Sequence, residues 1–375
     1  MEVADAAADR QVVMCVVGAR PNFVKVAPVL RALHASGRFR PLLVHTGQHY
    51  DSSMSAVFFR DLEIRDQPVN LAVGSGTHAA QTGAVMRALE DFVAEAPPAI
   101  MLTFGDVNST LAAALVAAKA GISQAHVEAG LRSGDPTMPE EVNRVVVDRL
   151  ADLLFTHSDE ADDNLRHEGV DPARIHQVGN VMIDSLVRLR TRWQGAGAAA
   201  LGDVPARYGV VTLHRPSNVD EPERLRQMLE ALSEVATSIP LIFPVHPRTR
   251  ARLPLAAISG IRLVEPMGYL AFLDLVEHAS VVLTDSGGIQ EETTALGVPC
   301  ITLRNSTERP VTVRLGTNRL ARDDLTGLIV ALWASLSSAR EAAPAIPLWD
   351  GHAAERIVRV LAVTLADPPP PRLAG

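Results

Sequence analysis

Short runs of Val, Ile and Leu alternate with helical stretches along nearly all of the 375 residues. The runs are continuously apolar, which is typical of strands in a parallel sheet that helices cover on both faces. A first series of expected strands comprises 12–18, 41–46, 99–105, 124–129, 152–157 and 174–179. A second series comprises 208–214, 241–246, 260–266, 280–285 and 299–304.

The two series are separated by residues 193–206, WQGAGAAALGDVPA, whose Gly, Ala and Pro content predicts a hinge or linker. The chain length also fits two domains better than one. We therefore predict an α/β protein with two Rossmann-like, doubly wound domains, at residues 11–190 and 207–348. In such folds ligands bind at the carboxyl ends of the strands, so the active site is expected in the cleft between the domains.

The ends of the chain have a different composition from the two series. Residues 349–366 are expected to form a C-terminal helix that packs back on the N-terminal domain. Residues 1–10 lack periodicity and residues 367–375 are rich in proline, so both are expected to be flexible tails.

Composition narrows the class of protein. Hydrophobic residues make up 47% and no apolar run approaches the length of a membrane span. No secretory pattern is visible, so we expect a cytoplasmic protein. The net charge of −8 argues against nucleic acid as the main partner. Cys15 and Cys300 lie in apolar runs without other ligands at metal spacing, so we expect buried thiols and no metal site.

Polar residues in the first series follow the ends of expected strands. Arg20 and Lys25 come after the first strand and are either ligand contacts or two solvated bases at a turn. Asp106 fits both a catalytic carboxylate and a helix N-cap. Glu128 interrupts an apolar strand, so it needs a partner or a raised pKa, as general acids and bases do. Glu140 fits ordinary helix-start chemistry, but it is close enough in sequence to converge with the other two acids.

The second series contains a predicted anion site. In DSGGIQEE a strand breaks at two glycines before a helix, whose first N–H groups and positive dipole end favour an anion at residues 285–288. Arg309 in the next loop is expected nearby, and an arginine beside a helix start strengthens the signal for phosphate. His214 follows the first strand of this series and fits either a structural histidine or a ligand contact.

Taken together, these stretches resemble the non-hydrolysing bacterial UDP-N-acetylglucosamine 2-epimerases from about Val12 to Leu361. The resemblance lies in motifs that occur in the family's order: GARPNFVKVAP, TGQHYD, GDVNST, HVEAGLRSGD, PEEVNR, HR, DSGGIQEE and TERP. It implies the two-domain fold called GT-B, a homodimer, and no cofactor.

The resemblance also implies a reaction and its residues. Members interconvert UDP-N-acetylglucosamine and UDP-N-acetylmannosamine by eliminating UDP and adding it back to a 2-acetamidoglucal. The family pattern assigns proton transfer and support of the glycal to Asp106, Glu128 and Glu140. It assigns binding of the departing diphosphate to Arg20, Lys25, His214, Ser286, Gly287, Gly288 and Arg309. Glu292 matches the residue that holds the ribose, and Phe272 the position beside uracil.

Two positions depart from the family pattern. The loop before PEE is about two residues shorter and ends in Met138, so the sugar side of the site is expected to differ. Many members are activated by a second substrate molecule, and Gln48 and His246 match residues used for this, but Ser217 replaces a glutamate. We therefore expect weak or no activation. A hyperbolic rate curve from UDP-N-acetylmannosamine alone would agree, and strong stimulation by trace UDP-N-acetylglucosamine would contradict it.

Three other functions share parts of these motifs. A hydrolysing epimerase would release N-acetylmannosamine and UDP. A GT-B glycosyltransferase would share the fold and diphosphate site but would not need three acids from one domain. A nucleotide-sugar sensor would bind without turnover.

Overall fold

The computed structural model describes residues 10–47, 52–245, 247–253, 258–321 and 342–366. The chain divides into two compact units. Unit 1 consists of Met1–Arg188 and Pro347–Gly375, and unit 2 of Leu189–Ile346. Among the described helices, none combines the length and the apolar character that crossing a membrane requires.

Unit 1 contains a seven-stranded, wholly parallel sheet in the order β3-β2-β1-β4-β5-β6-β7. The strand order reverses between β1 and β4, which is the topological switch point of a doubly wound fold. The strands are β1 (Gln11–Val17), β2 (Phe39–His45), β3 (Val69–Asn70), β4 (Ile100–Phe104), β5 (Gln124–Val127), β6 (Leu153–Thr156) and β7 (Ile175–Gln177).

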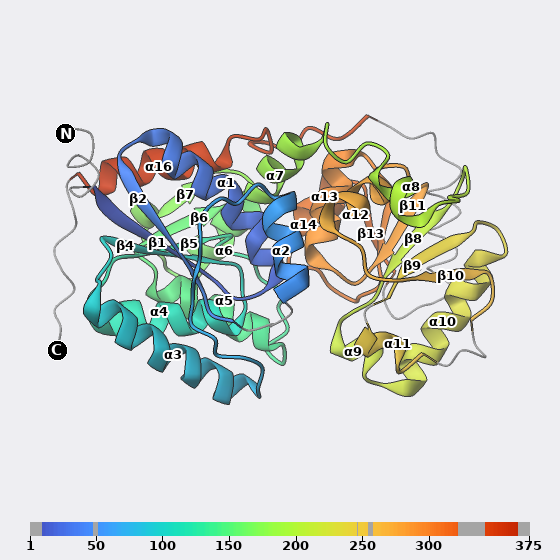
Figure 1. Ribbon diagram of the computed structural model, residues 1–375, viewed down its shortest axis with the longest axis horizontal. Coiled ribbons are helices and arrows are strands. Elements are labelled where there is room, and N and C mark those ends of the chain that lie inside the picture. The colour runs from blue at the N-terminus through green and yellow to red at the C-terminus, as the bar shows by residue number, and fades with distance from the viewer. Residues whose placement is uncertain (1–9, 48–51, 246, 254–257, 322–341, 367–375) are drawn as a thin grey trace. The chain divides into compact units, whose positions relative to one another are not determined.

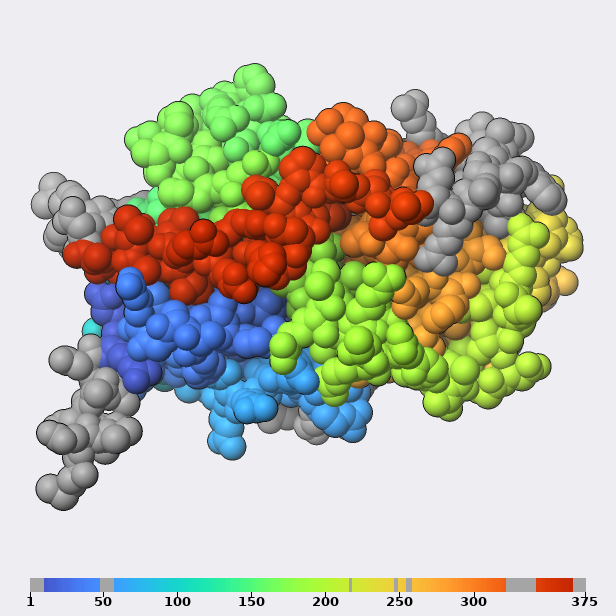
Figure 2. All heavy atoms as spheres, turned by 90° about the horizontal axis from the view of Figure 1, so that it is seen from above, coloured from blue at the N-terminus to red at the C-terminus, as the bar shows by residue number. Residues whose placement is uncertain are grey.

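Helices cover both faces of this sheet, with α1 and α16 on one face and α3 and α4 on the other (Figure 1). The helix α16, from the end of the chain, packs along α1 (Figure 2). The helices of unit 1 are α1 (Arg20–Ser36), α2 (Ser52–Asp61), α3 (His78–Glu95), α4 (Asn108–Ala120), α5 (Pro139–Leu150), α6 (Asp159–His167), the 3-10 turn η1 (Pro172–Arg174), α7 (Val181–Leu189) and α16 (Ala353–Thr364).

Unit 2 repeats the plan with six parallel strands in the order β10-β9-β8-β11-β12-β13. They are β8 (Gly209–Thr212), β9 (Leu241–Pro244), β10 (Ile261–Val264), β11 (Val281–Thr284), β12 (Cys300–Thr302) and β13 (Asn318–Leu320). The described helices are α8 (Ala196–Leu201), α9 (Pro216–Val219), α10 (Pro222–Ala236), α11 (Pro247–Arg250), α12 (Tyr269–Glu277), α13 (Gly287–Leu296) and α14 (Pro310–Arg314). The predicted fold class of two Rossmann-like, doubly wound units is therefore confirmed.

The stretch expected to be a linker is a packed part of unit 2. It begins with Trp193, whose side chain is fully buried and whose indole donates to Glu277 at 2.6 Å. It continues into α8, where the backbone N–H of Gly197 donates to Asp274 on α12 at 2.8 Å. Gly197 allows a close approach to α12, because a side chain there would lie 3.0 Å from Oδ2 of Asp274.

Both cysteines are buried free thiols, as expected. Burial raises the pKa of Cys15, and it raises the pKa of Cys300 to about 12. Neither thiol is ionised near neutral pH.

Candidate active site

The predicted site residues follow strands that flank the switch point of each sheet. In unit 1, Arg20, Asp106 and Glu128 come directly after β1, β4 and β5. In unit 2, His214 follows β8, Ser286 follows β11, and Arg309 follows β12. Because the strands of each sheet are parallel, their carboxyl ends lie at one edge of that sheet. The candidate residues of each unit therefore lie at this edge, where doubly wound folds bind ligands.

Lys25 and Glu128 form a buried ion pair between Nζ and Oε2. Their side chains are each 7% exposed. The alternative of a solvated base is therefore wrong for Lys25, which lies in the second turn of α1 rather than at the surface. The partner that a buried Glu128 requires is this lysine, 103 positions away in sequence.

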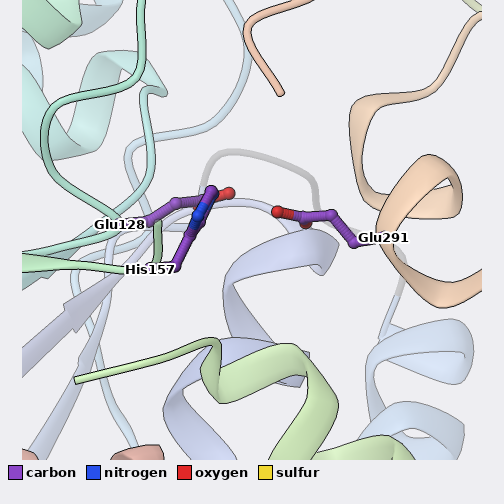
Figure 3. Close-up of side chains that lie close together, drawn as sticks. All are labelled: Glu128, His157 and Glu291. Atoms are coloured by element: carbon purple, nitrogen blue, oxygen red, sulfur yellow. The ribbon is translucent and has the colours of Figure 1, made fainter. Parts of the chain in front are cut away.

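Glu128 lies just beyond the strand that it was expected to interrupt, because β5 ends at Val127. Its φ of 73° is in the left-handed region, which costs a residue other than glycine about 1–3 kcal/mol. The amides of Glu128 and Ala129 both donate to the carbonyl of Phe155 at 3.0 Å, which holds the turn. Figure 3 shows the Glu128 side chain beside His157, which follows the neighbouring strand β6.

Asp106 is not a helix cap. The helix α4 begins at Asn108, and its N-cap is Val107, without a side-chain bond, so the N-cap alternative is wrong. The carboxylate of Asp106 instead accepts from Nε of Arg144 at 3.1 Å, and its backbone carbonyl accepts from Asn143 at 2.8 Å. The Asp106 side chain is 26% exposed, so solvent or a ligand can reach it.

Glu141 was not among the predicted site residues, which included only its neighbour Glu140. Its carboxylate accepts from the backbone amides of Ser133 and Gly134 and pairs with Arg144. Burial alone would raise its pKa, but these donors hold the pKa of Glu141 below its usual value. Glu141 thus fixes the loop before α5.

Glu140, in contrast, is partly buried and its carboxylate has no hydrogen-bond or ion-pair partner among the described residues. Arg144 links Asp106 to Glu141 in the first turn of α5, the turn that also carries Glu140. Glu128 lies near the residue before Asp106, because a side chain added at Gly105 would lie 3.3 Å from Oε2 of Glu128. Unit 1 thus gathers the three acids around the ends of β4 and β5.

Arg20 is the first residue of α1, and its guanidinium lies over the ring of Phe58, 5.9 Å from the ring centre. Asn22 holds the turn before it. The Asn22 side chain accepts from the amides of Gly18 and Ala19 and donates to the carbonyl of Phe104 at 2.8 Å. This bond ties the turn after β1 to the end of β4.

In unit 2, Arg309 packs against the start of α13. A side chain at Gly287 would overlap the guanidinium of Arg309, so glycine allows the guanidinium to approach the start of α13 closely. Ser286 is the N-cap residue of α13 but makes no side-chain capping bond. The first amides of α13 and the guanidinium of Arg309 are therefore neighbours, as an anion site needs.

The guanidinium of Arg309 is held by Glu308, a buried carboxylate that was also not among the predicted site residues. Glu308 pairs with Arg309, with Arg304 at 2.7 Å and with Arg215 at 3.4 Å. Burial alone would raise the pKa of Glu308, but Arg309, Arg304 and Arg215 hold it well below the usual value. Three arginines share one acid at this point, although Arg309 also contacts Glu291 at 3.1 Å.

The imidazole ring of His214 is paired with the buried carboxylate of Asp285. Its Nδ1 lies 2.9 Å from Oδ1 of Asp285, while 58% of its side chain remains exposed. Burial would raise the pKa of Asp285, but His214, the Arg215 amide and Asn218 lower it overall. The buried carboxylate orients the ring, and the exposed part of the ring is available to a ligand.

Glu292 and Phe272 lie on α13 and α12 of the same unit. Glu292 is buried and accepts from the hydroxyl of Tyr269 at 2.8 Å. Burial raises its pKa to about 7; the Tyr269 bond opposes this shift and the neighbouring Glu291 adds to it. Phe272 is partly buried.

The residues matched to substrate activation cannot be placed. Gln48 and His246 lie outside the described residues, as does the side chain of Ser217.

Comparison with known proteins agrees with this architecture. A family model described as UDP-N-acetylglucosamine 2-epimerase matches residues 31–362. The UDP-N-acetylglucosamine 2-epimerase of Methanocaldococcus jannaschii is 40% identical over 359 residues, covering 92% of this chain and 97% of the relative. The UDP-2,3-diacetamido-2,3-dideoxy-D-glucuronate 2-epimerase of Pseudomonas aeruginosa is 39% identical over 318 residues, covering 83% and 89%.

A solved structure is also similar over nearly the whole chain. The crystal structure of Methanocaldococcus jannaschii UDP-GlcNAc 2-epimerase in complex with UDP-GlcNAc and UDP has a TM-score of 0.88 at 40% identity, covering 94% of this chain and 99% of that one. The chain therefore belongs to the UDP-N-acetylglucosamine 2-epimerase family and is an enzyme with the two-domain fold type called GT-B.

Proposed function

We propose that this enzyme interconverts UDP-N-acetylglucosamine and UDP-N-acetylmannosamine without hydrolysis and without a cofactor. The observation that supports this most is the buried Glu128, held beside Lys25 in a left-handed backbone at the end of a central strand. Such strain persists only where the surroundings enforce it, and it is found mainly at functional sites. Asp106 and Glu140 supply the further acids that proton transfer at carbon requires.

The proposed reaction begins with loss of the C2 proton to one of these acids. The C1–O bond to UDP breaks with it, and the electron pair leaves with the diphosphate to give 2-acetamidoglucal and UDP. UDP then adds back to C1 while a proton is delivered to the opposite face of C2. Atoms balance without an oxidant, because the proton lost from one face of C2 is replaced by one delivered to the other face and the UDP that leaves is added back.

Unit 2 is proposed to bind UDP. Charge develops on the diphosphate as it leaves, so donors fixed in advance stabilise the transition state. The first amides of α13, Arg309 and His214 are such donors, because Glu308 and Asp285 hold the two side chains. We place the ribose at Glu292 and the uracil beside Phe272. We assign Arg20 and Lys25 to the diphosphate, and Lys25 also to Glu128, the acid with which it pairs.

A second substrate is favoured by the Pseudomonas aeruginosa relative, whose name specifies a 2,3-diacetamido-2,3-dideoxy-D-glucuronate. The same elimination would operate on that sugar, since the chemistry involves only C1 and C2. The choice lies on the sugar side of the site, where the shortened loop ends in Met138.

The test is incubation of the purified enzyme with each UDP-sugar in D2O, with C2 followed by NMR. Deuterium at C2 together with a UDP-linked epimer is the expected result. Free N-acetylmannosamine would indicate the hydrolysing reaction instead. Turnover that requires an acceptor would indicate a glycosyltransferase, and binding without exchange would indicate a sensor.

The family resemblance also supports a homodimer acting in the cytoplasm. Sedimentation analysis tests the dimer, and a monomer at micromolar concentration would contradict it.

A further inference from the structure

A fully buried histidine lies between the two turns that carry Asp106 and Glu128. His126 is on β5, and its Nε2 lies 2.8 Å from the carbonyl oxygen of Gly105, the residue before Asp106. Its Nδ1 lies 2.6 Å from Oδ1 of Asp148 on α5. Neither His126 nor Asp148 takes part in the proposed reaction.

The two partners determine the protonation of His126. A backbone carbonyl can only accept a hydrogen bond, so Nε2 carries a hydrogen. Asp148 also accepts from the amide of Gly130 and from Arg132, and hydrogen bonds from such donors favour the carboxylate form. The Asp148 carboxylate therefore also only accepts, so Nδ1 carries a hydrogen as well. His126 is thus a buried ring with a hydrogen-bond partner at each of its two nitrogens.

Asp148 extends the connection to the second turn. Its other oxygen, Oδ2, accepts from the amide of Gly130 at 3.0 Å and from Arg132 at 2.8 Å. Arg132 is held in turn by two bonds of 2.7 Å to Glu168 and by one to the carbonyl of Leu131. The charged groups that face this pair are therefore Arg132 directly and Glu168 behind it.

Both anchored residues are glycines with left-handed backbones, at φ of 65° for Gly105 and 80° for Gly130. A side chain at Gly105 would meet Lys25 and Glu128, and one at Gly130 would overlap the carbonyl of Ala161. Each turn thus contains a glycine, the most flexible residue type, and the side-chain bonds of His126 and Asp148 add to the backbone bonds that hold the two turns.

We propose that His126 and Asp148 are positioning residues that fix Asp106 and Glu128 relative to each other. The chain of bonds runs from the Gly105 carbonyl through His126 and Asp148 to the Gly130 amide, one residue before one acid and two after the other. The inference rests on the proposed function, because it concerns the two acids assigned there.

The test uses substitutions that remove or restore single bonds. His126→Ala removes both, whereas His126→Gln restores a donor near the position of Nε2. Asp148→Asn keeps the shape and removes the charge. Because small misplacements of catalytic groups cost up to about 100-fold, kcat should fall about 10–100-fold in His126→Ala and Asp148→Asn. The KM should stay within about twofold, since UDP is held by unit 2, and His126→Gln should recover part of kcat.

Asp184→Asn is the matched structural control. Asp184 is buried in unit 1 and accepts from the amides of Ala353 and Ala354 at the start of α16. It should lose stability with kcat unchanged. Unchanged kcat in folded His126→Ala and Asp148→Asn, or an equal loss in Asp184→Asn, would overturn the inference.

A measurement on the wild-type enzyme tests the inference even if the variants fail to fold. In NMR spectra of the ¹⁵N-histidine-labelled enzyme, the ring N–H groups of His126 should exchange slowly with solvent because both are buried and hydrogen-bonded, and rapid exchange would overturn the inference. The proposed function is judged separately: it fails if the wild-type enzyme places no deuterium at C2. If the wild-type enzyme does place deuterium at C2, unchanged kcat in the folded variants contradicts the positioning role alone.

Discussion

At the scale of single residues, the account depends on acids that unit 1 holds by specific partners. Asp106→Asn and Glu128→Gln should each lower kcat at least about 100-fold, as expected for loss of a general acid or base. Steady-state kinetics with UDP-N-acetylglucosamine checks this. Near-normal turnover in either variant would remove that residue from the mechanism.

Lys25 should matter for stability as well as activity. Lys25→Met leaves the buried Glu128 without its cation, and removing one partner of a buried pair costs about 3–5 kcal/mol. We expect that loss in the free energy of unfolding, measured by urea denaturation, together with a fall in kcat.

The matched control is Lys119→Met, which changes the only other lysine of the chain. Lys119 is exposed in the last turn of α4, so its loss should cost less than about 0.5 kcal/mol. If the two variants were equally stable, Lys25 and Glu128 would not form the pair described.

The sequence analysis singled out Lys25 and Glu128 as candidate site residues, but it did not predict that the two form an ion pair. Both follow strand ends, which the apolar pattern locates, yet their contact joins α1 to β5 across 103 positions. Glu141 and Glu308 were overlooked for a different reason: most of their arginine partners lie within four positions, but the sequence does not show that these pairs are buried. The N-cap alternative for Asp106 failed because α4 starts two residues later.

At the scale of elements, the start of α13 depends on a close approach. Gly287→Ala should displace Arg309, because the added side chain would overlap its guanidinium. We expect the Kd for UDP to rise at least about tenfold in calorimetry, the loss of one charge-assisted contact. Stability should change by about 1 kcal/mol at most, since alanine favours the helix.

Gly83→Ala in α3 is the control for that change. It also replaces a helical glycine, but no atom lies within 4 Å of the added carbon. It should slightly raise stability and leave UDP affinity unchanged. Equal affinities in both variants would contradict the role given to Arg309.

The same helix predicts a pH effect. Glu292 has a pKa of about 7 in the folded enzyme against 4.5 when free, so its contribution to stability is complete below about pH 4.5 and is lost as pH rises through 7. Glu292→Gln keeps an acceptor for the hydroxyl of Tyr269. Because glutamine does not ionise, the variant does not lose this stability as the pH rises. Relative to wild type, it should gain ~3 kcal/mol between pH 4.5 and 8, while its affinity for UDP falls.

Chemical denaturation at each pH measures this difference. Glu234→Gln on the exposed side of α10 is the control and should follow the wild-type curve. A Glu292→Gln curve parallel to wild type would contradict the raised pKa.

Elements were the best predicted level of the structure. All eleven expected strands exist, because continuous apolar runs of four or more residues are distinctive. The two strands that were missed, β3 and β13, are two and three residues long and lack such a run. The α8 segment was taken for a linker because its small residues form no apolar stripe, and of these residues only Gly197 is buried.

At the scale of the whole molecule, the end of the chain completes unit 1. Leu361 of α16 is fully buried, so Leu361→Ala should cost about 2–5 kcal/mol. Val363, two residues on, is 75% exposed, and Val363→Ala should cost almost nothing. Thermal unfolding compares the two, and equal melting temperatures would mean that α16 does not support the unit.

The central claim is that UDP leaves C1 and returns within one turnover. The most direct test uses UDP-N-acetylglucosamine labelled with ¹⁸O in the C1–O–P bridge, followed by ³¹P NMR during epimerisation. The account predicts that the label moves to non-bridging positions of the β-phosphate. Epimerisation at C2 with the label still entirely in the bridge would contradict it.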